Sequence, residues 1–222
     1  MIKPGKVNLK QVKTKETVNL GSHASEISSH YDAIAHKWDE ELKDSSYGTE
    51  ALMHAINMCG MERIRRNALD IGCGSGGRMI RLLESHAFQV TGLDCSEKML
   101  AIAHEQHPAG MWVHADITEW NTSERFDLVL AWDSIFHVSL EKQEAVLIKM
   151  ISLLKNNGIL LYTIGDEIGE HVSEWHDRSF YYSSLGIEQN IKILLDHDCR
   201  LRHLELDQYP LKHCTLIAKK EQ

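Results

Sequence analysis

The chain has 222 residues and a formal net charge of −8, which predicts one α/β domain with a full hydrophobic core. This acidity argues against nucleic acid as the main partner, because phosphate binding needs a basic face. No apolar run approaches the length of a membrane span, and the N-terminus lacks the apolar core of a signal peptide. Five cysteines without a Cys-x-x-Cys pair indicate reduced thiols, and we therefore expect a cytoplasmic protein.

The N-terminal region divides into an arm and the start of the domain. Residues 1–24 are polar and carry five lysines against one acid, which predicts a basic arm that is solvated or loosely docked. The domain is expected to occupy residues 25–222. Tyr31 and Trp38 fall at helical spacing and share one face of a first helix. A second helix is expected over residues 50–58.

Residues 67–77 read Asn-Ala-Leu-Asp-Ile-Gly-Cys-Gly-Ser-Gly-Gly, a short apolar strand that runs into a glycine-rich turn. An amphipathic helix follows, so this stretch has the layout of a nucleotide-binding βαβ unit. Further strands are expected at 89–93, 111–114, 126–132, 158–164, 201–206 and 214–218. Helices are expected between them at 97–104, 141–154 and 188–195.

This alternation predicts an α/β fold with a mostly parallel sheet and helices on both faces. The strand at 126–132 is mostly apolar, as expected of a strand that is covered on both sides. The last two strands are joined by a short connection through Tyr209 and Pro210, which predicts an antiparallel hairpin and hence one reversed strand. Residues 165–186 break the pattern. We expect them to form a functional loop on the substrate side.

The glycine turn has two interpretations. Gly72, Gly74 and Gly77 match G-x-G-x-x-G, a pattern typical of dinucleotide sites. Asp70 argues against a dinucleotide, because a carboxylate at the strand end would repel a pyrophosphate bound at the helix N-terminus. The same carboxylate would suit a ligand that carries an ammonium group.

Two more acids end the next strands. Asp94 can accept hydrogen bonds from both hydroxyls of a ribose, and Asp116 is placed where an adenine amino group could be recognised. The carboxyl ends of parallel strands meet at one edge of a sheet, where open α/β sheets bind ligands. Asp70, Asp94 and Asp116 therefore predict a binding site for an adenosine-containing ligand.

These stretches resemble the motifs of the class I S-adenosylmethionine-dependent methyltransferases of the small-molecule type. Residues 69–76 resemble the first motif of that family and residues 90–99 the second. Residues 114–117 resemble the stretch that contacts adenine, and residues 126–130 the fourth strand. Residues 31–39 are similar to the N-terminal helix of small-molecule members. The resemblance implies a single Rossmann-like domain with a seven-stranded sheet and S-adenosyl-L-methionine as cofactor.

The resemblance also implies individual roles. Asp70 and the glycine turn would hold the methionine part of the cofactor, Tyr31 would close over it, and Trp132 would line its methyl end. Met99 and Ile117 fit a plain core role equally well. The residues implied to bind the cofactor are Tyr31, Asp70, Gly72, Cys73, Gly74, Ser75, Gly76, Asp94, Cys95, Met99, Asp116, Ile117 and Trp132.

Methyl transfer from a sulfonium is an in-line displacement, so positioning supplies much of the catalysis and a general base is optional. The candidate bases are Asp133 and His137, which directly follow the fourth strand. We expect substrate contacts in the 165–186 segment, at His171, Trp175, Tyr181 and Tyr182. The sequence predicts no metal site.

The leading hypothesis is a methyltransferase that acts on a small-molecule acceptor. An NAD-type oxidoreductase would account for the literal glycine pattern. A non-catalytic S-adenosylmethionine-binding regulator and an RNA or protein methyltransferase are further alternatives that the sequence leaves open.

Overall fold

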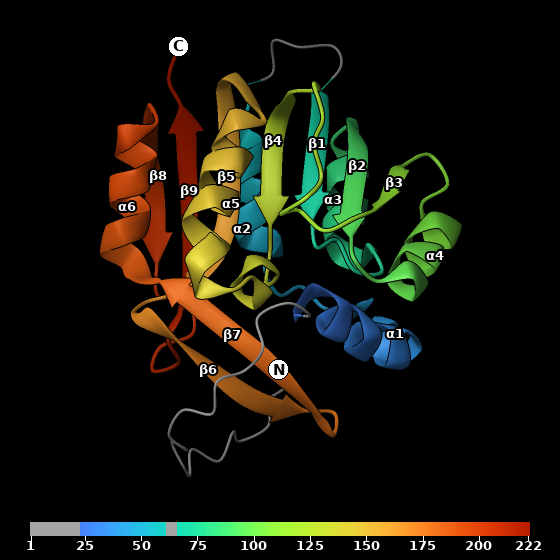
Figure 1. Cartoon of the computed structure of the whole chain (residues 1–222). Coiled ribbons are helices and arrows are strands. Elements are labelled where there is room, and N and C mark those ends of the chain that lie inside the picture. The colour runs from blue at the N-terminus through green and yellow to red at the C-terminus, as the bar shows by residue number, and fades with distance from the viewer. Residues whose placement is uncertain (1–22, 61–65) are drawn as a thin grey trace.

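The computed structural model describes residues 23–60 and 66–222. Within them, the strands are β1 (Arg66–Ile71), β2 (Phe88–Asp94), β3 (Met111–His114), β4 (Phe126–Ala131), β5 (Leu154–Gly165), β6 (Ile168–Trp175), β7 (Arg178–Leu185), β8 (Cys199–Glu205) and β9 (His213–Lys220). A seven-stranded sheet has the order β3-β2-β1-β4-β5-β9-β8 (Figure 1). Strand β9 runs antiparallel to β5 and β8, whereas β1 to β5 pair in parallel. The expected sheet with one reversed strand is therefore confirmed.

Helices cover both faces of this sheet. The described helices are α1 (His23–Leu42), α2 (Thr49–Met58), α3 (Gly77–Ser85), α4 (Glu97–Gln106), the short 3₁₀ helix η1 (Ile135–His137), α5 (Leu140–Ser152) and α6 (Gly186–Asp196). Leu128 and Leu130 of β4 pack in the cluster that α2 and α3 complete. Val129 and Ala131 pack in the cluster of α5 and α6. Because β4 is buried at every position, its sequence is mostly apolar.

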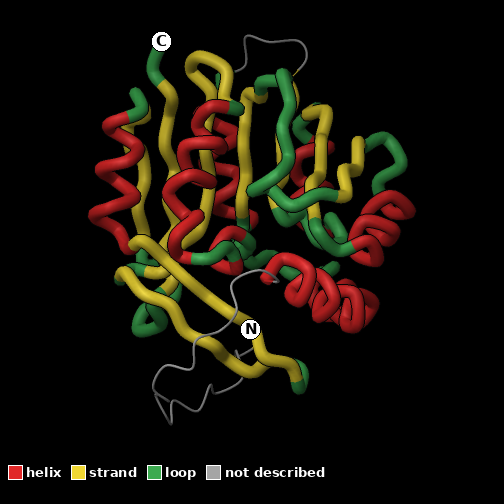
Figure 2. The backbone as a smooth tube through the Cα atoms, in the orientation of Figure 1, coloured by secondary structure: helices red, strands yellow, loops and turns green. Residues whose placement is uncertain are grey.

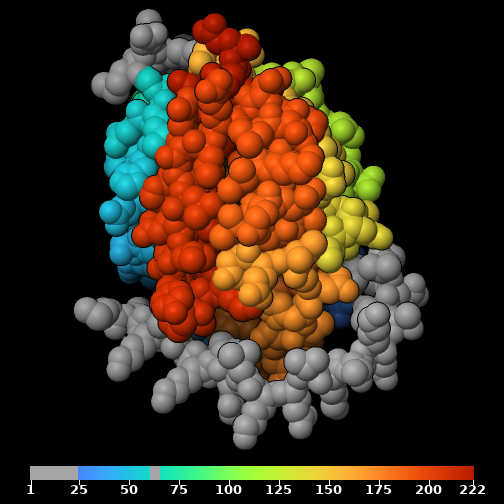
Figure 3. All heavy atoms as spheres, turned by 90° about the vertical axis from the view of Figure 1, so that its left-hand side faces the viewer, coloured from blue at the N-terminus to red at the C-terminus, as the bar shows by residue number. Residues whose placement is uncertain are grey.

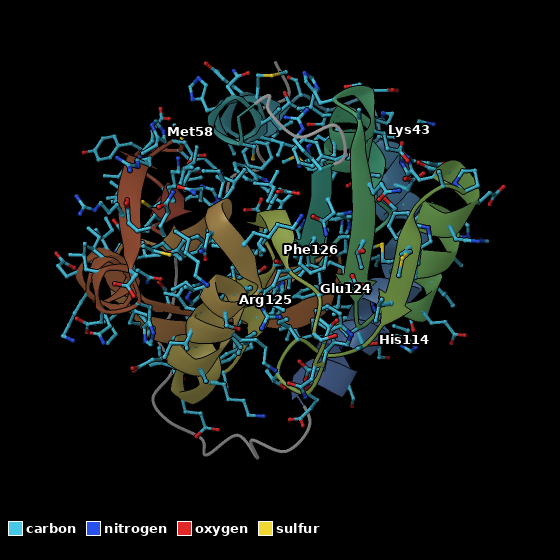
Figure 4. All side chains as sticks on the ribbon, turned by 90° about the horizontal axis from the view of Figure 1, so that it is seen from above. Lys43, Met58, His114, Glu124, Arg125 and Phe126 are labelled. Carbon is cyan, nitrogen blue, oxygen red and sulfur yellow. The ribbon has the colours of Figure 1, made fainter. Side chains whose placement is uncertain are left out.

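Other views show the same layers. Viewed from above, Phe126 lies near the middle of the molecule, where β4 begins, and Met58 marks the end of α2 nearer the outside (Figure 4). Viewed from the side of β8 and α6, the surface is continuous from α2 to α5, and the β6–β7 hairpin projects below it (Figure 3). No helix of the described residues is long and apolar enough to cross a membrane.

Helix α1 lies across the carboxyl edge of the sheet (Figure 2). The Ser28 hydroxyl donates to the carbonyl of Cys95 at 2.5 Å. Asp32 accepts hydrogen bonds from the Ser96 hydroxyl (2.5 Å) and the Lys98 amide (3.0 Å). Ser96 also caps α4, as its side chain accepts from the Met99 amide. These bonds fix α1 against the turn between β2 and α4.

Residues 168–185 form a β-hairpin, so the expectation that this segment is a loop is wrong, whereas its place on the substrate side stays a prediction. Strands β6 and β7 pair antiparallel from Ile168↔Leu185 to Trp175↔Arg178. His176 and Asp177 form the turn at positive φ, 48° and 59°, as a type I′ turn requires. The sequence did not indicate a hairpin because this turn lacks glycine and because β6 is largely exposed, which removes the alternation of apolar residues.

The predicted basic arm falls almost wholly outside the described residues. The structure begins at His23, and His23 and Ala24 already belong to α1. The role of the arm therefore stays a prediction.

Gly72 opens the glycine turn with a φ of 70°, and a Cβ built there would lie 2.3 Å from Cβ of Ser134. We expect Gly72→Ala to lower the free energy of unfolding by about 1–3 kcal/mol through overpacking, in addition to the strain of the left-handed conformation. Gly60→Ala is the matched control, since Gly60 has a φ of 69° and no atom of the described residues lies within 4 Å of the built Cβ. Urea unfolding measures both variants. Equal losses would contradict the close packing of the turn on Ser134.

Candidate active site

A cavity of about 500 Å³ lies at the carboxyl edge of the sheet. Its walls come from α1, the glycine turn, the ends of β2 and β4, and the residues that follow β3 and β4. The structure places all the predicted cofactor-binding residues in this lining, namely Tyr31, Asp70, Gly72, Cys73, Gly74, Ser75, Gly76, Asp94, Cys95, Met99, Asp116, Ile117 and Trp132.

The residues predicted for catalysis and substrate binding divide into two groups. Asp133, His137 and Trp175 line the same cavity. Tyr181 and Tyr182 lie outside its lining, as does His171. These three residues belong to the β6–β7 hairpin, which contacts the cavity wall from behind.

Asp70 lies near the end of β1, paired with Gly92 of β2 and Leu130 of β4. The residue is 3% exposed. Burial, together with the charge of Asp94, raises the pKa of Asp70 to about 7, although the charge of Arg78 acts in the opposite direction. A cation in the cavity would favour the ionised form of this carboxyl group.

Asp94 ends β2 and joins two turns. One carboxylate oxygen accepts a hydrogen bond from the Gly74 amide (2.8 Å) and the other from the Ser96 amide (2.8 Å). Burial raises the pKa of Asp94, and these hydrogen bonds oppose the shift. Each carboxylate oxygen has a further lone pair, so Asp94 can accept from a ligand while it holds the glycine turn.

Asp116 begins the turn after β3 and accepts a hydrogen bond from the Thr118 amide at 2.8 Å. Lys149 of α5 holds this turn from the other side. Its ammonium group donates to the carbonyls of Ile117 (2.9 Å), Thr118 (3.0 Å) and Trp120 (3.0 Å). Lys149 was not predicted from sequence, because no motif marks a lysine that binds backbone carbonyls from a distant helix.

Tyr31 and His137 meet at the cavity, with the Tyr31 hydroxyl 2.9 Å from Nε2 of His137. Nδ1 of His137 lies 2.7 Å from the Tyr181 carbonyl, which can only accept, so Nδ1 carries the proton. Burial lowers the pKa of His137 to about 4. The imidazole is therefore neutral near pH 7, and its Nε2 lone pair accepts from the Tyr31 hydroxyl.

The hairpin supports His137 from behind. The Tyr182 ring contacts the His137 ring with centroids 4.9 Å apart, and His171 stacks on Tyr182 at 5.1 Å. At the hairpin tip, Trp175 packs edge-on against Trp38 of α1 at 5.2 Å. Trp175 thus reaches the cavity directly, whereas Tyr181, Tyr182 and His171 lie behind its wall.

Asp133 follows β4 with a φ of 49°, a strained conformation for a residue other than glycine. Its amide donates to the Thr163 hydroxyl at 2.8 Å. His213 donates from Nε2 to Asp133 (2.8 Å) and from Nδ1 to Asp207 (2.7 Å). Burial lowers the pKa of His213, but the bonds and charges of the two carboxylates outweigh it and raise the pKa overall.

His213 and Asp207 were missed by sequence reasoning. His213 is the first residue of β9, and Asp207 precedes this strand. Both are far along the chain from Asp133, and no local sequence pattern indicates them. Among the described residues, no cluster of histidine, cysteine and acidic side chains could hold a metal ion. All five cysteines are free thiols.

The fold and the cavity together define a Rossmann-like domain with a cofactor-type site at its carboxyl edge. Comparison with known proteins relates part of the chain to a protein family. The family model of a methyltransferase domain matches residues 68–158, which run from β1 into β5.

Two curated relatives extend this match. The chain is 30% identical over 143 residues to thiocyanate methyltransferase 1 of Arabidopsis thaliana, covering 60% of this chain and 62% of that protein. It is 29% identical over 186 residues to trans-aconitate 2-methyltransferase of Acidovorax ebreus, covering 75% of this chain and 70% of that protein. For several curated relatives, the match spans between 41% and 62% of their length.

A solved structure shows the same fold. The 1,6-didemethyltoxoflavin-N1-methyltransferase of Burkholderia thailandensis, with bound 1,6-didemethyltoxoflavin and S-adenosylhomocysteine, aligns with a TM-score of 0.72. The identity is 16%, over 95% of this chain and 94% of that chain. Together, the family-model match over residues 68–158 and the similarity to these relatives support a class I S-adenosylmethionine-dependent methyltransferase.

Proposed function

We propose that this chain binds S-adenosylmethionine in the carboxyl-edge cavity and transfers its methyl group to a small-molecule acceptor by in-line displacement. The observation that carries the proposal is the convergence of Asp70, Asp94 and Asp116 with the glycine turn in one cavity. The family match supports the reaction class. The names of the two relatives, which methylate thiocyanate and trans-aconitate, support a small acceptor.

The residues present fit this cofactor group by group. Asp70 offers a buried carboxyl to the ammonium and Asp94 offers lone pairs to the ribose hydroxyls. Asp116 keeps one carboxylate oxygen without a described partner, which can accept from the adenine amino group. When bound, S-adenosylmethionine supplies an activated methyl group on a sulfonium. The aromatic faces of Tyr31 and Trp132 at the cavity would contribute about 0.5–2 kcal/mol of cation–π attraction to that charge.

Proton removal from the acceptor can be assigned to Tyr31 and His137. The neutral His137 is fixed by the Tyr181 carbonyl, so its Nε2 is ready to accept the Tyr31 proton. Tyr31 can in turn accept a proton from an acceptor N–H or O–H bound beside its hydroxyl in the same step as it gives its own proton to His137, because burial and nearby negative charges raise the pKa of Tyr31 and disfavour a free tyrosinate. Asp133, held by His213 and Thr163, would orient the acceptor from the facing wall.

The acceptor-binding roles of Trp175, Tyr181, Tyr182 and His171 stay predictions. Trp175 is placed to contact an acceptor directly, because it lines the cavity. The others would adjust the position of His137.

A screen with labelled cofactor against small amines, phenols, thiols and carboxylates tests the proposal, together with calorimetric titration of S-adenosylhomocysteine and NADH. We expect S-adenosylhomocysteine to bind and label to reach at least one small acceptor. Tight NADH binding without response to S-adenosylhomocysteine would support the oxidoreductase alternative. Cofactor binding without label transfer to any acceptor would favour the regulator alternative.

Asp70 is expected to make cofactor affinity depend on pH. The pKa of Asp70 is raised to about 7, and the ligand ammonium binds the ionised carboxylate, so binding releases a proton below that pH. Affinity for S-adenosylhomocysteine should rise about tenfold between roughly pH 6 and pH 8. Calorimetric titration at both values measures the change, and Asp70→Asn should abolish it. A pH-independent affinity in the unmodified chain would show that Asp70 does not hold the ammonium.

A further inference from the structure

Strand β6 has an open edge. It pairs with β7 in a sheet of two strands, and among the described residues no strand pairs with its other edge. Apart from β7, β6 packs mainly on α6. The strand lacks the proline, bulge or lysine that commonly blocks an exposed edge. Its unpaired N–H and C=O groups can therefore bind another extended segment.

One face of β6 alternates apolar and acidic side chains. Ile168 and Val172 are 69% and 59% exposed. Two exposed glutamates, Glu170 and Glu174, alternate with them on the same face, because side chains two residues apart in a strand point the same way. Neither glutamate forms an ion pair with another described residue. This face suits a segment that brings both apolar contacts and positive charge.

The N-terminal arm, residues 1–22, lies outside the described part of the chain, and its sequence meets these needs. It carries five lysines against one glutamate. Between Gly5 and Gly21 it contains no proline or glycine, and its valines and threonines favour a strand. In an extended strand, Lys13 and Lys15 would share one face. The arm thus offers a strand-forming segment with charges opposite to those of β6.

The arm joins the domain beside the hairpin. Helix α1 begins at His23, and its Ile27 packs in one cluster with Phe180 and Trp175 of the hairpin. Helix α1 and the hairpin lie at the same edge of the main sheet (Figure 1). The 22 residues of the arm span up to about 70 Å when extended, whereas the eight residues of β6 span about 27 Å. The arm can reach the whole edge, and its attachment keeps its effective concentration high.

A second copy of the chain is the other occupant that an open edge could bind. Pairing β6 with itself would bring the glutamates of two strands together, and like charges across strands destabilise pairing. The arm instead brings lysines to these glutamates. We propose that residues 6–20 add a strand to the open edge of β6 and hold the hairpin in place. Because Trp175 of the hairpin lines the cavity, the docked arm would also steady that part of the cavity wall.

Hydrogen exchange of the full chain at low salt, followed by mass spectrometry on peptides from β6, tests the proposal. We expect the outer amides of β6 to exchange at least about tenfold more slowly in the unmodified chain than in Thr14→Pro, because proline removes an amide donor and disrupts strand pairing. Thr14→Ala is the matched control, since it keeps the amide and should retain the protection. Peptides from β4 should be unchanged in both variants, which shows that the domain is intact.

Charge reversal tests the contact between lysines and glutamates. Changing Lys13 and Lys15 together to glutamate should also speed exchange of the outer amides of β6 about tenfold or more. Adding Glu170→Lys and Glu174→Lys to that variant should restore protection, because opposite charges again face each other. Raising the salt concentration should weaken the protection in the unmodified chain, since the charges are exposed and screened.

The other outcomes would overturn the proposal. If the outer amides of β6 exchange without protection in the unmodified chain at low salt, the arm does not cover the edge. Protection that survives Thr14→Pro and rises with protein concentration would show that a second copy binds there. Protection that survives Thr14→Pro at every protein concentration would show that the hairpin protects its own amides without the arm.

Discussion

Replacing Tyr31 with phenylalanine is expected to lower turnover by about 10²–10⁴-fold, the usual contribution of a positioned acid–base group. The hydroxyl donates to Nε2 of His137 at 2.9 Å, and this bond links the hydroxyl to a neutral imidazole. The ring should stay in place, because it packs edge-on against Trp38 at 5.8 Å and against Phe180 at 5.2 Å. Cofactor affinity should therefore change by no more than a few-fold.

The measurement is the rate of S-adenosylhomocysteine formation with an acceptor from the labelled-cofactor screen. Tyr182→Phe is the matched control, because Tyr182 also contacts the His137 ring, at 4.9 Å, but lies outside the cavity lining. It should retain most of the turnover. His137→Gln should lose about as much turnover as Tyr31→Phe, and the double variant little more, since the two residues act as one unit.

Other results would change the assignment. Full activity in Tyr31→Phe would mean that methyl transfer needs no base on this wall of the cavity. A large loss in Asp133→Asn together with an active Tyr31→Phe would instead place the base next to His213.

The ligand-binding edge of the sheet could be predicted from the sequence, because the motifs that indicate it are local. A glycine turn and the acids Asp70, Asp94 and Asp116 each lie at the end of an apolar strand, and parallel strands bring their ends to one edge. Sequence order alone therefore fixed which residues would meet. The cavity lining agrees with that prediction at all of these positions.

The groups that support the edge could not be predicted, because the topology of the sheet brings them together. Strand β9 inserts between β5 and β8, and this places His213 beside Asp133 at the end of β4. Arg78 meets Tyr47 because the segment before α2 packs on the start of α3. Such partners have no fixed spacing in the sequence, and one chain without relatives gives no signal for them.

The hairpin shows a different limit. Its two strands show no alternation of apolar and polar residues that would predict them. Strand β6 is exposed along most of its length, and Phe180 of β7 packs in the interior. Phe180 packs with Tyr31 and Trp175, so the hairpin is held by contacts with α1. Tertiary packing, which the local pattern does not contain, decides the structure of this segment.

Asp94→Ala is expected to weaken S-adenosylhomocysteine by about a hundredfold or more. Each of the two ribose hydroxyls would lose a hydrogen bond to a carboxylate, worth about 1.5–3 kcal/mol. The side chain also accepts from the Gly74 and Ser96 amides, so part of the loss would come from a looser glycine turn. Asp94→Asn, which keeps one oxygen acceptor in the same place, should fall between the unmodified chain and the alanine variant.

Asp32→Ala separates the ribose contact from simple support of the turn. Asp32 accepts from the Ser96 hydroxyl and the Lys98 amide at the start of the same helix, but it does not line the cavity. Its loss should lower stability while S-adenosylhomocysteine affinity stays within about threefold, because no bond to the ligand is removed. Calorimetric titration and urea unfolding of both variants measure the two effects. Unchanged S-adenosylhomocysteine affinity in Asp94→Ala would show that the ribose binds elsewhere. Equal losses of affinity in Asp94→Ala and Asp32→Ala would show that Asp94 supports the turn and does not bind the ribose.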